Sequence, residues 1–339
     1  MFAAAEYASA AIPDYPQLAP WAVAFDLGDG RLQLRGSLTT FTLPHPFFAS
    51  VFRRMEAHLD GSHSADGIAD ALGAEIDRSA VVFLLKMLAA SGLLIAGIGP
   101  RPSALAEPQL RFFQQINRDA ARAAAALESK RLRIVARDAI ATSIAALLRQ
   151  AGLPERGADI EAVAAPEHVP AAIEGHLDLI VAVTDGLSDR LFAAVNEQCL
   201  KSGTRWLSAV ISGPQARLGP TFVPDQTACY TCFRHRLNSN AADPAADHAF
   251  EAAVARDEPE QGGLEAFSAI IAGHLALETV RLLTGLSEPS TVARYYLFNA
   301  TAPDSEVHNV LRVPRCPSCG GSKILRRAWD ADPADGDEA

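Results

Sequence analysis

Apolar and polar residues alternate in three short runs between residues 21 and 43, which read WAVAF, RLQLRG and SLTTFTL. This alternation predicts strands, and Gly28-Asp29-Gly30 between the first two runs predicts a hairpin turn. Apolar residues then recur at helical spacing from residue 48 to residue 59, and Ser64 and Asp77 are suited to cap two further helices. Strands followed by three helices predict a small winged-helix-like α+β domain over residues 21–97.

A different rhythm begins at residue 131. The strand pattern RLRIVA is followed by the helical pattern TSIAALLRQAG, and the strand pattern HLDLIVAVTD is followed by another helical pattern. Later strands read TRWLSAVIS, ARLGPTFV, YYLFNA and EVHNVLRV, and a long helix reads GLEAFSAIIAGHLALETVRLLTG. Repeated strand–helix–strand units predict an α/β domain with a mostly parallel sheet over residues 131–325.

The segments between and beyond these patterns carry weaker signals. Residues 1–20 are Ala-rich and lack a basic leading segment, which is typical of a mobile N-terminal tail rather than a signal peptide. Residues 98–130 predict a linker helix that acts as a solvated spacer, and residues 238–262 predict a crossover loop. Residues 326–339 are acidic and are expected to be disordered.

Composition argues against two classes of partner. The formal net charge is −10 and no block of lysine or arginine is present, so a nucleic acid is not expected to be the partner. No apolar run reaches about 18 residues, so no membrane span is expected. We therefore expect a cytoplasmic protein, in which thiols stay reduced.

Four of the five cysteines form two C-x-x-C pairs, in TACYTC and in RCPSCGG. In a reducing compartment such pairs favour a metal site over disulfides, and two of them supply the four thiolates of a tetrahedral Zn²⁺ site. We therefore predict a structural zinc site formed by Cys229, Cys232, Cys316 and Cys319. The alternative is two unrelated thiol pairs or redox motifs. Cys199 stands alone in a helical pattern and is interpreted as a packing residue.

Several of these motifs together resemble a known family. The strand and acid in VAVTDG, the later Asn196, the run GPTFVPDQTACYTC and the closing CPSCG are similar to the E1-like, or ThiF-like, fold of ubiquitin-activating-type adenylating enzymes. With its N-terminal module, the chain resembles the C protein of cyclodehydratases that make thiazole- and oxazole-modified peptides. The resemblance implies that residues 21–97 are a RiPP recognition element, which binds the leader of a precursor peptide. It also implies a YcaO-family enzyme as partner, and a homodimer.

The sequence departs from the adenylating members of this family at the turn after the first strand. A phosphate-binding turn there requires glycines, whereas this turn reads IVARDAIATSIA, with Ala136, Asp138 and Ala141 at the glycine positions. Asp138 would also repel phosphates. We therefore predict that this chain binds no ATP. Asp185 matches the metal-binding acid of the family, and without a phosphate site it is interpreted as a strand-end cap.

The leader peptide is expected to add as a strand to the edge of the third strand, over residues 37–43, beside the helix that begins after Asp77. The predicted contacts with the leader are made by Thr39, Phe41, Arg78, Val82, Leu85 and Lys86. In this arrangement the two valine and leucine side chains receive apolar anchors, and the two basic side chains pair with acidic leader residues. Val82 and Leu85 could equally be ordinary core residues, and the basic side chains could simply be solvated.

These observations favour a binding subunit that presents a precursor peptide to a YcaO-family enzyme for azoline formation. Two alternatives remain open. One is an active E1-like adenylyltransferase that acts on a peptide or carrier terminus, and the other is a winged-helix regulator that binds DNA.

Overall fold

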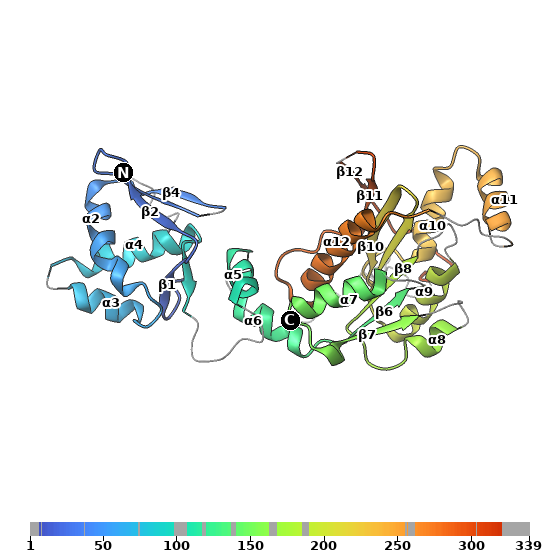
Figure 1. The fold of residues 1–339 in the computed structure, drawn as a ribbon, viewed down its shortest axis with the longest axis horizontal. Coiled ribbons are helices and arrows are strands. Elements are labelled where there is room, and N and C mark those ends of the chain that lie inside the picture. Colours follow the sequence, from blue (N-terminus) through green and yellow to red (C-terminus); the bar gives the residue numbers. More distant parts are fainter. Residues whose placement is uncertain are drawn as a thin grey trace, which may run out of the picture. The chain divides into compact units, whose positions relative to one another are not determined.

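The computed structural model describes residues 7, 9–36, 38–73, 75–97, 107–116, 120–136, 140–162, 168–184, 190–254, 256, 262–302 and 304–320. The chain forms two compact units, unit 1 (Met1–Ala126) and unit 2 (Leu127–Ala339). Figure 1 shows both. The boundary lies close to the predicted start of the second domain at residue 131.

Unit 1 combines short antiparallel strands with a helical layer. Its elements are β1 (Pro16–Leu18), β2 (Val23–Asp26), β3 (Leu32–Arg35), β4 (Thr40–Thr42), α2 (Pro46–Met55), η1 (Glu56–His58), α3 (Ala65–Leu72), α4 (Arg78–Ala90), β5 (Leu94–Ala96) and α5 (Glu107–Ile116). Helix α6 (Ala120–Glu128) spans the boundary between the two units. Strands β2, β3 and β4 form a three-stranded antiparallel sheet in that order, and β1 pairs with β5.

Local signals in the sequence account for where these elements begin and end. The hairpin between β2 and β3 turns at Gly28 and Gly30, which both have positive φ. The Ser64 hydroxyl accepts a hydrogen bond from Gly67 N at 3.0 Å and caps α3, and the Asp77 carboxylate accepts one from Ser79 N at 2.7 Å and caps α4. The predicted strands and helices are thus present. The winged-helix assignment stays a prediction.

Two expectations for unit 1 and its flank differ from the structure. Part of the predicted N-terminal tail is ordered, because Pro16–Leu18 pair with Ala96, Ile95 and Leu94 of β5 and Ala19 is buried. The predicted linker helix over residues 98–130 is two helices, α5 and α6, which carry buried side chains such as Phe113 and Leu127. A solvated spacer would expose these residues, so α5 and α6 belong to packed structure.

Unit 2 is built on one seven-stranded sheet. Its strands are β6 (Leu132–Ala136), β7 (Ala158–Ala162), β8 (Leu179–Thr184), β9 (Trp206–Ser212), β10 (Gln215–Phe222), β11 (Arg294–Asn299) and β12 (Ser305–Asn309). The order across the sheet is β12-β11-β10-β9-β8-β6-β7. The pairs from β7 to β9 are parallel, and the pairs from β9 to β12 are antiparallel. The sheet is therefore mixed rather than mostly parallel, because its second half consists of antiparallel pairs.

Helices cover both faces of this sheet (Figure 1). They are α7 (Ile140–Gln150), η2 (Glu155–Gly157), α8 (Val169–Ala172), α9 (Arg190–Ser202), α10 (Tyr230–Ser239), α11 (Pro244–Val254) and α12 (Glu265–Thr284). Helices α7 and α12 pack together on one face, and α8, α9 and α10 pack on the other. Helix α11 lies within the predicted crossover loop, so that segment is partly helical.

Helix α12 is long and apolar enough to cross a membrane by length and composition alone. Its most apolar window is 56% buried within the structure, and Phe267, Ile271 and Leu275 belong to the core. The buried Glu278 lies on the same helix. These features are typical of a core helix.

Candidate functional site

The four predicted cysteine ligands lie together in unit 2. Their sulfur atoms are all within 4.8 Å of one another. The Sγ–Sγ distances are 3.8 Å for Cys229–Cys232, 3.7 Å for Cys229–Cys316 and 3.5 Å for Cys232–Cys319. A tetrahedral zinc site with bonds of about 2.3 Å separates its sulfurs by about 3.8 Å. The donor set and its spacing therefore fit a metal ion bound by four thiolates.

Two different local structures place these ligands. Cys229 is the N-cap residue of α10, but its side chain accepts no capping hydrogen bond. The side chain of Asn196 in α9 takes this role and accepts a hydrogen bond from Tyr230 N at 2.9 Å. Cys232 follows in the first turn of the same helix. Cys316 begins a tight turn in which Gly320 N donates to Cys316 O at 2.7 Å. Asn196, which the sequence linked only to the family resemblance, thus has a structural role here.

Contacts outside the sulfur cluster join the two cysteine pairs. The Arg312 guanidinium donates to Asp225 O and to Cys319 O, both at 3.1 Å, and Val313 N donates to Cys232 Sγ at 3.4 Å. The hydroxyls of Thr231 and Ser318 are 2.7 Å apart. The sequence motif did not indicate the contacts of Arg312 with Asp225, of Val313 with Cys232 and of Thr231 with Ser318, because each joins residues 81 or 87 positions apart.

The cysteine cluster is largely buried. Three of its cysteines are buried, and Trp206, Phe222 and Phe233 belong to the same apolar cluster. Hydrogen bonds from the Cys229 thiol and from Val313 N lower the pKa of Cys232, whereas the hydrogen bond to Cys232 and burial raise the pKa of Cys229. Burial also raises the pKa of Cys199, which is a core residue as predicted and is unsuited to act as a nucleophile.

The predicted peptide-binding edge of unit 1 is the outer side of β4. Gly36 N donates to Thr39 O at 2.7 Å, and Leu43 N donates to Leu32 O at 2.9 Å. In an antiparallel pair of strands, every second residue of a strand hydrogen-bonds to its neighbour. The backbone N–H and C=O groups that point toward β3 are therefore those of Thr39, Phe41 and Leu43. Thr40 and Thr42 therefore direct theirs outward. Within the described residues β4 pairs only with β3, which leaves this edge open.

The side chains predicted to contact a leader peptide have different surroundings. Phe41 and Val82 are half-buried, and Phe41 packs against the core of unit 1. Leu85 is fully buried in that core, so it is not available as an apolar anchor. Arg78 is exposed and pairs with Asp66 and Asp70 of α3.

These placements revise the predicted site. Arg78 already has two carboxylate partners, so it is not a free cation for an acidic leader. Lys86 is half-buried. The outward backbone groups of Thr40 and Thr42 are the additional candidates. These two residues could have been predicted from the sequence, because an edge strand points the N–H and C=O groups of every second residue away from its neighbouring strand.

The predicted nucleotide turn is described only at its two ends. Ala136 ends β6 and Ala141 lies in the first turn of α7, and both side chains are buried. Asp138 and Asp185 lie outside the described residues. The predicted absence of ATP binding therefore stays a prediction.

One buried hydroxyl lies near this turn. Strands β7 and β8 lie on opposite sides of β6, so the order in which strands are added to the sheet reverses between β6 and β8. Such a position is called a topological switch point, and α/β proteins commonly bind ligands there. Thr184 ends β8 at this position, and its Oγ1 is buried without a hydrogen-bond partner among the described residues. A polar ligand at the switch point would satisfy this atom.

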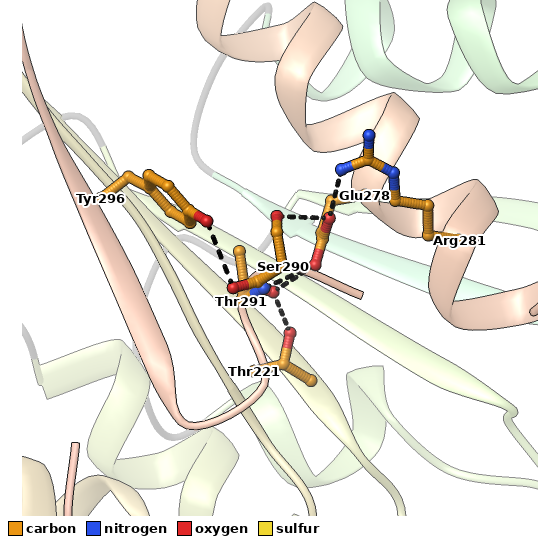
Figure 2. Close-up of polar contacts among 6 residues, drawn as sticks. All are labelled: Thr221, Glu278, Arg281, Ser290, Thr291 and Tyr296. Carbon is orange, nitrogen blue, oxygen red and sulfur yellow. Dashed lines mark hydrogen bonds and ion pairs between the residues drawn. The ribbon is translucent and has the colours of Figure 1, made fainter. Parts of the chain in front are cut away.

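A second polar cluster in unit 2 joins α12 to the sheet (Figure 2). The Glu278 carboxylate is 1% exposed and accepts hydrogen bonds from Thr291 N at 2.7 Å, Thr291 Oγ1 at 2.8 Å and Ser290 Oγ at 2.9 Å. Arg281 lies 3.3 Å from it, and Thr221 Oγ1 is 2.6 Å from Thr291 Oγ1. A buried carboxylate with this many donors fixes the loop after α12 against β10.

Comparison with known proteins identifies the family of unit 2. The ThiF family matches residues 138–320, more than half of the chain. The chain belongs to the ThiF family. A search of curated proteins returned no match.

Solved structures share this fold over both units. The heterocyclase TruD is similar with a TM-score of 0.70 and 20% identity, over 91% of this chain and 43% of that chain. A heterocyclase in complex with substrate and cofactor has a TM-score of 0.68 and 20% identity, over 92% and 40%. MccB of E. coli with ATP has a TM-score of 0.69 and 14% identity, over 90% and 99%. The chain thus spans less than half the length of the heterocyclases it matches.

Proposed function

We propose that this chain is a leader-peptide-binding subunit that presents a ribosomal precursor peptide to a YcaO-family cyclodehydratase for azoline formation. The observation that carries the proposal is the open edge of β4, where Thr40 and Thr42 direct backbone donors and acceptors outward. An extended peptide that adds to this edge gains main-chain hydrogen bonds without needing a particular sequence. Each bond contributes about 1 kcal/mol.

Side chains next to this edge then supply selectivity. The side chains of an added strand point alternately to the two faces of the sheet. One face carries Phe41 of β4, and the other carries Thr40 and Thr42. The aspartates that pair with Arg78 are exposed at 81% and 71%. They leave that end of α4 with a surplus of negative charge. A leader with a basic residue near α3 therefore fits better than the acidic leader that the sequence indicated.

The similarity to heterocyclases supports a role in a larger assembly. The matched heterocyclase chains are more than twice as long as the region they share with this chain, because this chain covers 43% and 40% of them. We propose that a YcaO-family partner supplies the ATP-dependent activation of the peptide, and that both proteins are cytoplasmic. In this assembly the chain binds and orients the precursor and does not adenylate it.

The four cysteines have a structural role in this proposal. We propose that they bind Zn²⁺ with no open coordination position, since four thiolates complete a tetrahedral site. The metal joins the start of α10 to the segment that follows β12. It thereby stabilises unit 2 and takes no part in the reaction.

Binding of a synthetic leader peptide to the full chain tests the proposal. The probe is the fluorescein-labelled leader of a candidate precursor peptide, and anisotropy should give a dissociation constant in the micromolar range or below. Thr40→Pro or Thr42→Pro removes an outward N–H, and should weaken binding at least about tenfold. Ala24→Pro is the matched control, because the alternation places its N–H on the outer edge of β2. Equal losses in all three variants would refute the β4 site.

Adenylation is the second candidate function. Membership in the ThiF family and the buried Thr184 hydroxyl at the switch point favour it. ATP–pyrophosphate exchange, measured with the chain and its precursor peptide but without a partner, separates the two functions. The subunit proposal expects no exchange above background. Robust exchange would establish an adenylating enzyme.

A further inference from the structure

We infer that Arg35 selects the leader peptide by pairing with a carboxylate on a strand that has added to the open edge of β4. The inference rests on the proposed function and deepens it, because it names the class of peptide that this edge accepts. Main-chain hydrogen bonds at a sheet edge do not depend on sequence, so selectivity has to come from side chains beside the edge. The expected ligand is an extended peptide with an aspartate or a glutamate at one position.

Arg35 lies on the exposed face of the three-stranded sheet of unit 1, which we call the solvent face. The strand register places Arg35 of β3 opposite Val23 of β2 and opposite Thr40 of β4. Residues directly opposite one another share a face. Val23 is 63% exposed and Arg35 is exposed, whereas Leu32 and Leu34 on the other face of β3 are buried in the core. An added strand would therefore direct every second side chain to the face that carries Arg35.

Arg35 differs from the other arginines of residues 1–97 because it has no carboxylate partner among the described residues. The other four each form at least one ion pair. They are Arg31, Arg53, Arg54 and Arg78. Their charges are compensated within the chain. The charge of Arg35 is therefore available to a carboxylate of a bound peptide.

Contacts on the solvent face hold the Arg35 side chain in place. Nη2 of Arg35 donates to Gln33 Oε1 at 2.9 Å, and Gln33 Nε2 donates to Thr42 Oγ1 at 2.9 Å. Cζ of Arg35 lies 5.6 Å from the ring centroid of Phe25, a distance typical of a cation–π contact. A guanidinium has five N–H groups, and among the described residues that of Arg35 makes only this one hydrogen bond. Donors for a carboxylate therefore remain.

The guanidinium is within reach of a strand added to β4. Neighbouring strands are about 4.8 Å apart, so the added strand would lie about 10 Å from β3. Arginine and glutamate side chains that extend toward each other can span this separation, and the side chains of Thr40 and Thr42 between them are short. The guanidinium would have to turn away from Phe25, but this movement breaks no ion pair of the described residues. We therefore place the carboxylate on the solvent face, next to Thr40 and Thr42.

The start of α4 has the opposite preference. Arg78 is compensated there by Asp66 and Asp70, which leave a surplus of negative charge. A carboxylate of the peptide near α3 would be repelled, whereas a carboxylate on the solvent face would be attracted by Arg35. The two positions together favour a leader that carries both an acidic and a basic residue, and they disfavour a peptide of uniform charge.

Fluorescence anisotropy with the full chain and a fluorescein-labelled synthetic leader tests the inference. Arg35→Gln removes the charge and should weaken binding about three- to fivefold, and Arg35→Glu adds repulsion and should weaken binding at least about tenfold. Arg53→Gln is the matched control, because it removes an exposed arginine that pairs with Asp26 of β2, the strand farthest from β4. It should change the dissociation constant less than about 1.5-fold. Equal losses for Arg35→Gln and Arg53→Gln would overturn the inference.

Charge exchange between the chain and the peptide identifies the carboxylate. Each acidic residue of the synthetic leader is replaced by lysine in turn. One of these peptides should bind the wild type more weakly and should regain affinity with Arg35→Glu, because the opposite charges are restored. A misfolded variant could not produce this gain, so the test stays decisive if Arg35→Glu is less stable. Absence of a gain at every position would overturn the inference.

The same measurements separate this inference from the proposed function. Binding that Thr40→Pro weakens and Arg35→Gln leaves unchanged would overturn the role of Arg35 and would keep the β4 site. A wild-type chain that does not bind the leader would overturn both.

Discussion

The side-chain hydrogen bonds that we compare in unit 1 and unit 2 join residues at very different distances along the sequence. In unit 1 the sheet is a meander of neighbouring strands, and Ser64 and Asp77 cap helices within their own turns. In unit 2 the decisive contacts join remote segments, such as Cys229 with Cys316 across 87 positions and Thr221 with Thr291 across 70. Unit 1 should therefore tolerate the loss of one polar contact, whereas unit 2 should be sensitive to it.

Removal of a cysteine ligand should have the largest effect. Cys316→Ser leaves three thiolates and releases the segment after β12 from α10. Structural zinc contributes on the order of 10 kcal/mol in small zinc peptides. We expect loss of bound zinc and a thermal unfolding transition of unit 2 that falls by more than about 10 °C, as measured by metal analysis and calorimetry.

Cys199→Ala is the matched control for this change, because it removes a buried thiol outside the cluster. It should keep a full complement of zinc and cost about 1–2 kcal/mol. Equal zinc content in the two variants would show that the four cysteines do not hold the metal.

Removal of the buried carboxylate in Figure 2 should have the next largest effect. Glu278→Ala leaves the donors of Ser290 and Thr291 without their acceptor and should destabilise unit 2 by about 3–5 kcal/mol. Urea unfolding measures this change. Glu265→Ala, at an exposed position of the same helix, should change stability by less than about 0.5 kcal/mol. A similar small effect for both would mean that the cluster is not a stabilising clamp.

A local cap of unit 1 should contribute less. Ser64→Ala removes the acceptor for Gly67 N at the start of α3 and should cost about 1 kcal/mol. Calorimetry should show a small downward shift of the unit 1 transition and an unchanged unit 2 transition. A loss as large as that of Glu278→Ala would contradict the contrast between the units.

Removal of the ion pair between Lys130 and Asp178, beside β6, should have the smallest effect on stability. This effect should depend on pH. Burial raises the pKa of Asp178, but hydrogen bonds from Lys130 and Arg131 N outweigh it, so the pKa is lower than its ordinary value of 3.8. The stabilisation is therefore present above the unfolded pKa and is lost as pH falls through the lower folded pKa.

Asp178→Asn should reduce stability by less than about 1 kcal/mol at pH 7, and this loss should shrink as the pH falls below the ordinary pKa of 3.8. Urea unfolding at several pH values measures the difference. Glu197→Gln, which removes an exposed pair with Lys201, is the control and should change little. An equal loss at pH 7 and at pH 2 would show that the carboxylate charge is not involved.

The sequence predicted the features that depend on local signals. The hairpin at Gly28, the caps at Ser64 and Asp77 and the clustering of the cysteines follow from turn chemistry, capping and metal-ligand spacing. The turn and capping signals act within a few residues, and four cysteines in two C-x-x-C pairs commonly bind a metal ion. The clustering of the four cysteines could therefore be predicted without knowing that the fold brings the two pairs together.

The sequence could not predict features that depend on tertiary packing. The strand pattern cannot distinguish parallel from antiparallel neighbours, so the mixed sheet was predicted as mostly parallel. Periodicity placed Leu85 on a possible binding face, but the helix buries that side in the core. Arg78 looked free because its partners Asp66 and Asp70 lie on another helix.

Hydrogen exchange at the edge of β4 tests the central claim most directly. Addition of the synthetic leader peptide to the full chain should slow exchange of the Thr40 and Thr42 amides, because these donors become bonded to the added strand. The Ala24 amide, on the outer edge of β2, should exchange at the same rate with and without the peptide. Saturating peptide that leaves Thr40 and Thr42 unchanged would contradict the account.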